Sequence, residues 1–233
     1  MDMLVNIPES GILRDIWVNL IQHDRFLLIL GGLVRTLQIA AFGVLIGCVL
    51  GFALAVMRLS RFTPLKMFAT AYISIIRGIP LMVQLLLWNY VVFTTPGFSK
   101  VLVCIITFGV NSGAYVAEVF RAGILSVDRG QTEAGRSVGL SSIQTMRLIV
   151  LPQAIKNALP SLCNEFIILF KDTALVGFIG VQDMTRVANF ITSRTFNAFV
   201  PLLFVALIYL IVVLILTKLL SMLERRLRES DKR

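Results

Sequence analysis

Four long segments of this chain carry no formal charge: residues 36–57, 78–99, 101–117 and 195–217. A transmembrane α-helix needs about 20 consecutive apolar residues, and three of the four segments reach that length. Charged residues gather in short clusters between them. This alternation predicts an all-α integral membrane protein.

The segment boundaries predict five membrane crossings. The first, third and fifth are expected at residues 27–57, 101–124 and 198–220. The fourth follows Pro152 and is interrupted by four charged residues: Lys156, Glu165, Lys171 and Asp172.

The second crossing is expected to be broken. It begins at Thr63-Pro64, which resembles an N-cap and the first helical residue. Some thirty helical residues would span about 45 Å, too long for one straight crossing. Pro80, in the sequence Arg77-Gly78-Ile79-Pro80, lacks a backbone N–H and should interrupt the helix.

Basic residues mark one side of the membrane. They cluster after the first, third and fifth spans, and these three sites share a side only if the fourth segment also crosses. The pattern predicts five transmembrane helices with the N-terminus outside and the C-terminus inside. The basic residues concerned are Arg58, Arg61, Lys66, Arg121, Arg129, Arg136, Arg147, Arg225, Arg226, Arg228, Lys232 and Arg233.

Three regions follow from this organisation. Residues 1–25 are expected to form an amphipathic segment in the membrane interface, and Asp2 and Glu9 argue against a cleavable signal peptide. Residues 26–222 form the transmembrane domain, with a polar loop at about 126–152, and residues 223–233 form a basic cytoplasmic tail.

The composition agrees with a membrane protein, because 57% of residues are hydrophobic, 15% are charged and the mean hydropathy is +0.86. In this setting the net charge of +9 indicates positive-inside loops, and we expect no nucleic-acid binding. Cys48, Cys104 and Cys163 are expected to be free thiols. His23 is isolated, so no metal site or catalytic grouping is indicated.

The polar loop predicts two short helices joined by a sharp bend. Gly139 should end the first helix, and Ser141 and Gln144 have the spacing of a capping box that begins the second. Pro152 is expected to end or kink that second helix. An ordinary amphipathic helical hairpin would explain these features equally well.

The loop also resembles the signature of ABC importer permeases: Glu-Ala-Ala, three residues, Gly, nine residues, Ile, one residue, Leu-Pro. Only Gly135 departs from it, standing where the second alanine belongs. The resemblance implies a coupling helix that docks on a cytoplasmic ABC ATPase dimer. The coupling residues it implies are Glu133, Ala134, Gly135, Gly139, Leu140, Leu151 and Pro152.

From about Gly31 onward the chain resembles the polar amino acid (histidine, glutamine, glutamate, arginine and opine) permeases. The likeness is carried by Gly32-Leu33, Thr36-Leu37, Arg77-Gly78-Ile79-Pro80 with Gln84, Tyr115 with Glu118 and Arg121, Asn164-Glu165 and Lys171-Asp172-Thr173-Ala174-Leu175.

This resemblance implies a non-enzymatic transport subunit in a bacterial inner membrane. Its partners would be a second permease subunit, identical or paralogous, the ATPase dimer and an extracytoplasmic amino-acid-binding protein, all surrounded by membrane lipid. The chain itself has no Gly-rich phosphate loop, so ATP and Mg would be bound by the ATPase.

Ionisable residues inside a span are candidate functional groups. Glu165 could receive the ammonium group of an amino acid, or it could pair with Lys171 or another span. Glu118 and Arg121 have the spacing of a helical ion pair. The proposed substrate path comprises Gly78, Pro80, Gln84, Tyr115, Asn164, Glu165, Lys171 and Thr173.

Two other functions remain open from the sequence. A permease of the same class could carry an opine, a sulfur-containing amino acid or another small zwitterion. A stand-alone channel or ion-coupled transporter would need no ATPase, and copurification of an ATP-binding subunit distinguishes the two classes.

Overall fold

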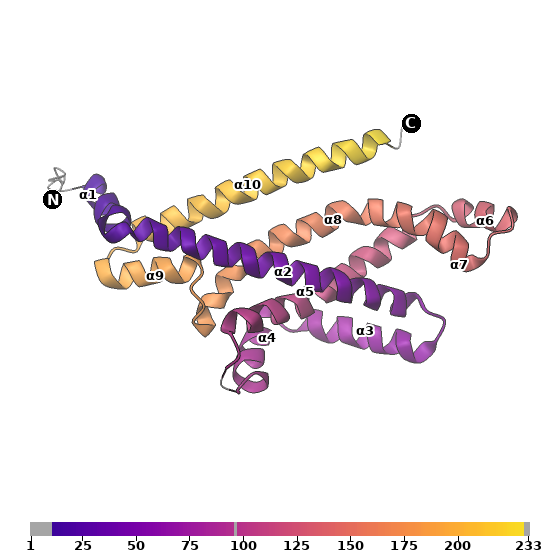
Figure 1. Ribbon diagram of the computed structural model, residues 1–233, viewed down its shortest axis with the longest axis horizontal. Helices are drawn as coiled ribbons and strands as arrows, with labels where there is room; N and C mark the ends of the chain where they lie inside the picture. The colour runs from indigo at the N-terminus through magenta and orange to yellow at the C-terminus, as the bar shows by residue number, and fades with distance from the viewer. Residues whose placement is uncertain (1–10, 96, 231–233) are drawn as a thin grey trace.

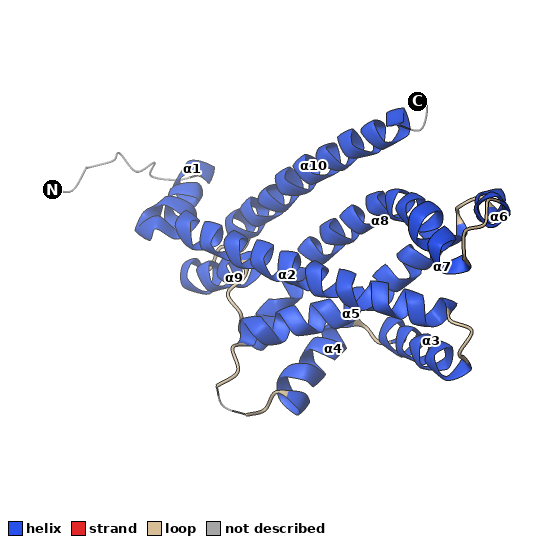
Figure 2. Cartoon of the chain, turned by 45° about the vertical axis from the view of Figure 1, so that its right-hand side comes forward, coloured by secondary structure: helices blue, strands red, loops and turns tan. Residues whose placement is uncertain are grey.

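The computed structural model describes residues 11–95 and 97–230, and every regular element within these ranges is helical (Figures 1 and 2). The first ten residues of the proposed amphipathic segment and the last three of the proposed basic tail lie outside the described residues. The α-helices are α1 Ile12–Ile16, α2 Arg25–Leu59, α3 Thr63–Gly78, α4 Leu81–Leu87, α5 Lys100–Leu125, α6 Arg129–Ser137, α7 Ser142–Thr145, α8 Leu151–Asp172, α9 Met184–Thr195 and α10 Phe199–Ser230.

Helices α2 and α5 form the closest pair in the bundle. Three glycines on α2, spaced four residues apart, lie against α5, and a Cβ added at Gly47 would be 2.6 Å from the Ser112 hydroxyl oxygen. A Cβ at Gly51 would be 2.5 Å from a Val116 methyl carbon. Glycine at these positions therefore lets the two backbones approach, as in small-xxx-small membrane packing.

The second span is broken as predicted. Helices α3 and α4 meet at 101°, and the helical path continues from α4 through a π-helical turn, Trp88–Val92. Pro80 is the N-cap of α4. The predicted start was one residue late, because the N-cap of α3 is Phe62 and Thr63 is already helical.

The prediction that Pro152 ends its helix was wrong. The helical path runs from α7 through a π-helical turn, Met146–Val150, directly into α8, which contains Pro152. Pro152 has no N–H to donate into the turn before it, and that turn is the one wound as a π-helix. The proline farther inside α8 is Pro160.

Three helical stretches of the described chain are long and apolar enough to cross a membrane singly: Ile12–Leu59, Lys100–Leu125 and Phe199–Leu227. The bent α3–α4 pair supplies a fourth candidate. Helix α8 carries the charged residues noted above and is absent from this set.

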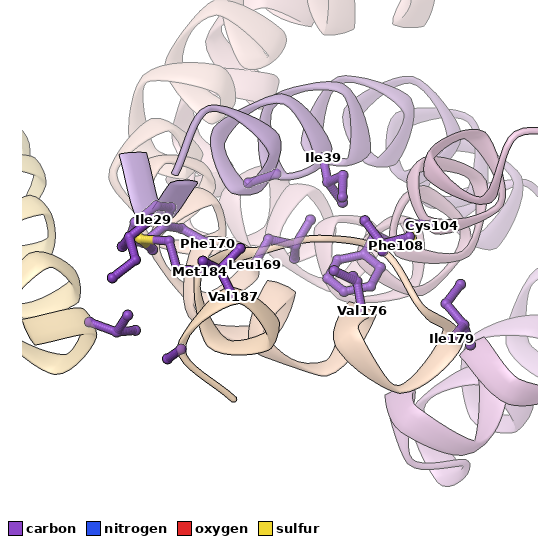
Figure 3. Close-up of a cluster of buried hydrophobic side chains, with 14 of the residues drawn as sticks. Ile29, Ile39, Cys104, Phe108, Leu169, Phe170, Val176, Ile179, Met184 and Val187 are labelled. Atoms are coloured by element: carbon purple, nitrogen blue, oxygen red, sulfur yellow. The ribbon is translucent and has the colours of Figure 1, made fainter. Parts of the chain in front are cut away.

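The main hydrophobic core lies where α2, α5, α8 and α9 meet (Figure 3). Gly32 of α2 packs there against the start of α9, since an added Cβ would be 2.7 Å from the Met184 nitrogen. The N-terminal arm joins the same end of the bundle, because the Thr195 hydroxyl donates to the Asn19 side-chain oxygen at 2.6 Å. The labelled core residues include Ile29, Ile39, Phe108, Leu169, Phe170, Val176 and Met184.

The α2–α5 contact makes a stability prediction. Gly51→Ala should destabilise the purified protein by about 1–3 kcal/mol, because the new methyl group overlaps Val116 and the Ala117 backbone. A Cβ added at Gly31, on the same helix, would have no neighbouring atom within 4 Å, so Gly31→Ala serves as the control. Thermal unfolding in detergent measures both, and equal midpoints for the two variants would contradict the packing argument.

Candidate functional site

Helix α6 has defined caps at both ends. The Asp128 carboxylate accepts a hydrogen bond from the Gly130 N–H at 2.6 Å at its start. At its end Gly139 has φ +91°, the Gly139 N–H donates to Arg136 O, and the Leu140 N–H donates to Gly135 O, both at 3.1 Å. This is a Schellman motif, and it confirms that Gly139 ends the helix.

Helix α7 begins with the predicted capping box. The Gln144 N–H donates to the Ser141 hydroxyl at 3.2 Å, and the Ser141 N–H donates to the Gln144 side-chain oxygen at 2.8 Å. Both helices of the loop are therefore fixed by their own caps.

Gly135 holds the two halves of the loop together. It is the buried residue of α6, and a Cβ there would be 2.8 Å from both an Ile149 and a Thr145 carbon. The departure from the family signature thus has a structural reason in this chain, because α6 packs directly against Thr145 and Ile149 at this position.

The outer surface of the loop is both charged and apolar. Glu133 and Ala134 are exposed, as are Val138 (77%) and Ile143 (80%). Figure 1 shows α6 and α7 at one end of the molecule, beyond the main bundle. Leu140 and Leu151 are half-buried and Pro152 is exposed, so most of the proposed coupling residues reach the surface.

Glu165 is buried inside the bundle with only 6% exposure. Its carboxylate accepts a hydrogen bond from the Ser112 hydroxyl of α5 at 3.1 Å. Glu165 and Lys171, both among the described residues, form no ion pair with each other. The partner of Glu165 is therefore a neutral group on another helix.

Gln84 closes the break between α3 and α4. Its side-chain amide donates to Ile76 O at 2.7 Å and to Ile79 O at 2.8 Å, and its oxygen accepts from Asn111 of α5 at 3.3 Å. Two carbonyls freed by the break are thus occupied within the chain. Gln84 and Glu165 contact neighbouring residues of α5, Asn111 and Ser112.

Glu118 is the centre of a larger charge cluster than the sequence indicated. The predicted pair is present, with Arg121 Nε 2.8 Å from Glu118 Oε2. Arg58 of α2 also donates to Glu118, and Arg77 lies 3.8 Å from it. Arg77 stacks over the Tyr115 ring at 5.1 Å. Of these contacts, only the Glu118–Arg121 pair could be predicted from the sequence, through its i, i+3 spacing.

The other proposed path residues occupy separate places. Thr173 is fully buried and donates to Phe170 O at 2.7 Å, while Lys171 is exposed beside α10. Asn164 is exposed, and Gly78 and Pro80 are exposed at the helix break. Gln84 and Glu165 each bond to α5, at the adjacent residues Asn111 and Ser112, whereas Lys171 and Thr173 make neither of these contacts.

Residues 43–229 match the family model for the binding-protein-dependent transport system inner membrane component. The chain belongs to this family. It is 39% identical to the glutamate/aspartate import permease protein GltK of Escherichia coli, covering 85% of this chain and 92% of that protein. It is 38% identical to the arginine transport system permease protein ArtQ of Bacillus subtilis, covering 87% and 94%.

A solved structure agrees with this assignment. The chain superposes on a subunit of an amino acid ABC transporter crystallised with histidines, with a TM-score of 0.83 and 43% sequence identity. The match covers 88% of this chain and 96% of that one. Family membership does not show whether the substrate is acidic or basic, because one of these relatives is named for glutamate and aspartate and the other for arginine.

The positive φ of Gly139 makes a prediction for the loop. Gly139→Val should loosen α6, because a β-branched side chain disfavours this backbone conformation, whereas Gly139→Asn should be tolerated. Hydrogen exchange of the amides in residues 129–150 measures the effect, and we expect a loss of protection for valine alone. Equal protection in both variants would rule out a conformational role for this glycine.

Proposed function

We propose that this chain is the permease subunit of an ATP-driven importer for a polar amino acid. One observation carries the proposal: the signature loop stands exposed at one end of a chain that belongs to the permease family. The named relatives, which import glutamate/aspartate and transport arginine, support amino acids as the substrate class.

The assembly proposed here has two permease subunits, two cytoplasmic ATPases that hold ATP and Mg, and an extracytoplasmic binding protein. The chain would cross a bacterial inner membrane five times, N-terminus outside, with α8 as the fourth crossing. Its 22 residues extend about 33 Å, enough to cross a hydrocarbon core of about 30 Å. The clustering of basic residues supports this count and orientation.

The coupling mechanism follows from the packing of the loop. In this proposal α6 docks on the ATPase through Glu133 and the exposed apolar side chain of Val138. Its tight contact at Gly135 transmits displacement to Ile149 and from there along α8. Helix α8 carries Glu165, so ATPase closure would shift the carboxylate that faces the substrate path.

Glu165 is the proposed recognition group for the substrate ammonium. The Ser112 hydroxyl holds its carboxylate in place from α5 and leaves further acceptor capacity on the two oxygens. A charged hydrogen bond in a dry setting contributes about 1.5–3 kcal/mol, enough to discriminate an ammonium-bearing ligand.

A charge reversal tests the docking surface. Glu133→Arg should reduce substrate uptake per ATP hydrolysed by about tenfold or more, since Glu133 is exposed and its side chain is not needed for folding. Gln131→Arg on the same helix is the control, because two residues place it about 200° around α6. The measurement uses the reconstituted complex with its binding protein, and unchanged coupling in Glu133→Arg would refute the docking assignment.

A second substitution tests the substrate path. Glu165→Gln keeps the shape and the acceptor for Ser112 but removes the charge, so substrate-stimulated ATP hydrolysis should fall about tenfold. Asp24→Asn makes the same carboxylate-to-amide change at an exposed residue before α2 and should have little effect. If Glu165→Gln retains full substrate stimulation while the complex assembles, Glu165 is structural.

A further inference from the structure

A cavity lies far from the coupling loop, between the first part of α2 and α9. It has a volume of about 800 Å³, and two arginines, Arg35 of α2 and Arg186 of α9, line it together with Gln182 and Asn189. Leu28 and Phe190 supply apolar wall. Figure 1 shows α9 alongside this end of α2.

Neither of the two arginines of this cavity forms an ion pair with a carboxylate of the described residues. Arg186 donates one hydrogen bond to Gly177 O at 3.1 Å, which leaves most of its five N–H donors available. Asp183 is fully buried and accepts hydrogen bonds from the Thr185 and Arg186 N–H groups. Burial raises the pKa of its carboxyl, and its oxygens are occupied by these two backbone N–H groups.

The register of α2 against α5 sets the depth of Arg35. Gly47 lies opposite Ser112 and Gly51 opposite Val116, so continuing the same offset places Arg35 level with Lys100, where α5 begins. From Arg35 to Arg58 the helix rises about 35 Å, slightly more than a hydrocarbon core of about 30 Å. In the proposed topology, with Arg58 at the inner interface, Arg35 lies at the level of the lipid phosphates on the opposite side of the membrane.

An apolar stripe leads from this cavity along the outside of α2. It continues the face of Leu28 and Arg35 at alternating steps of three and four residues, so it lies on one side of the helix. The exposed fractions of its residues lie between 37% and 73%: Phe42, Leu45, Val49, Phe52 and Val56.

We infer that this cavity binds the phosphate group of a phospholipid, whose acyl chain lies along the apolar stripe. Two guanidinium groups on one cavity supply the positive charge and the paired N–H donors that bind phosphate. The exposed stripe below them matches an acyl chain in polarity and direction, and an inorganic anion would leave that stripe uncovered. An anionic headgroup such as phosphatidylglycerol gains further from the net positive charge of the site.

The test uses the full-length chain purified from membranes with its copurifying subunits. Native mass spectrometry after exchange into equimolar phosphatidylglycerol and phosphatidylcholine should show several-fold preferential retention of phosphatidylglycerol. The double variant R35Q/R186Q should lose that preference. Arg61→Gln, just beyond the opposite end of α2, removes a positive charge that does not line the cavity. This variant should retain the preference for phosphatidylglycerol.

A photoactivatable phosphatidylglycerol locates the site independently of transport. Cross-links to peptides containing residues 27–42 and 182–193 are expected, and millimolar inorganic phosphate should not abolish them. Unchanged lipid preference in R35Q/R186Q would overturn the inference. So would cross-links from this cavity to a second permease chain in place of lipid.

Discussion

The close approach of α2 to α5 is the constraint on which the rest of the structure depends. Glycines on both helices face the partner, and an added Cβ at Gly109 would be 2.6 Å from Ile46, just as one at Gly47 would meet Ser112. Because these contacts repeat every four residues, sliding one helix along the other would bring side chains into the glycine positions. The pair is therefore held in a single axial register.

That register determines where the buried polar groups find partners. It places Ser112 where its hydroxyl reaches Glu165 on α8, and it places Glu118 within reach of Arg58 on α2. A polar group left without a partner in hydrocarbon costs several kcal/mol, so these contacts in turn oppose a change of register. Apolar packing and polar pairing thus specify the same arrangement of α2, α5 and α8.

The parts of the molecule that sequence predicts well are those fixed by neighbours along the chain. The capping box at Ser141, the bend at Gly139 and the break before Pro80 depend on a few adjacent residues, and all three are present. The charge cluster on Glu118 was predicted only as its pair with Arg121. Its other members come from helices whose relative height no local pattern specifies, so they could be found only in the structure.

Pro152 shows that a proline does not always end a helix. It was expected to stop or kink the helix, yet the helical path from Ser142 to Glu165 continues through it, with a π-helical turn immediately before the proline. In the proposed coupling, this continuous path is what would carry displacement from the loop to the bundle interior. Pro160 lies inside α8 and also lacks the N–H for an internal hydrogen bond. Because helices bend most readily at such a position, the proposed coupling predicts that α8 bends at Pro160, between the docking loop and Glu165.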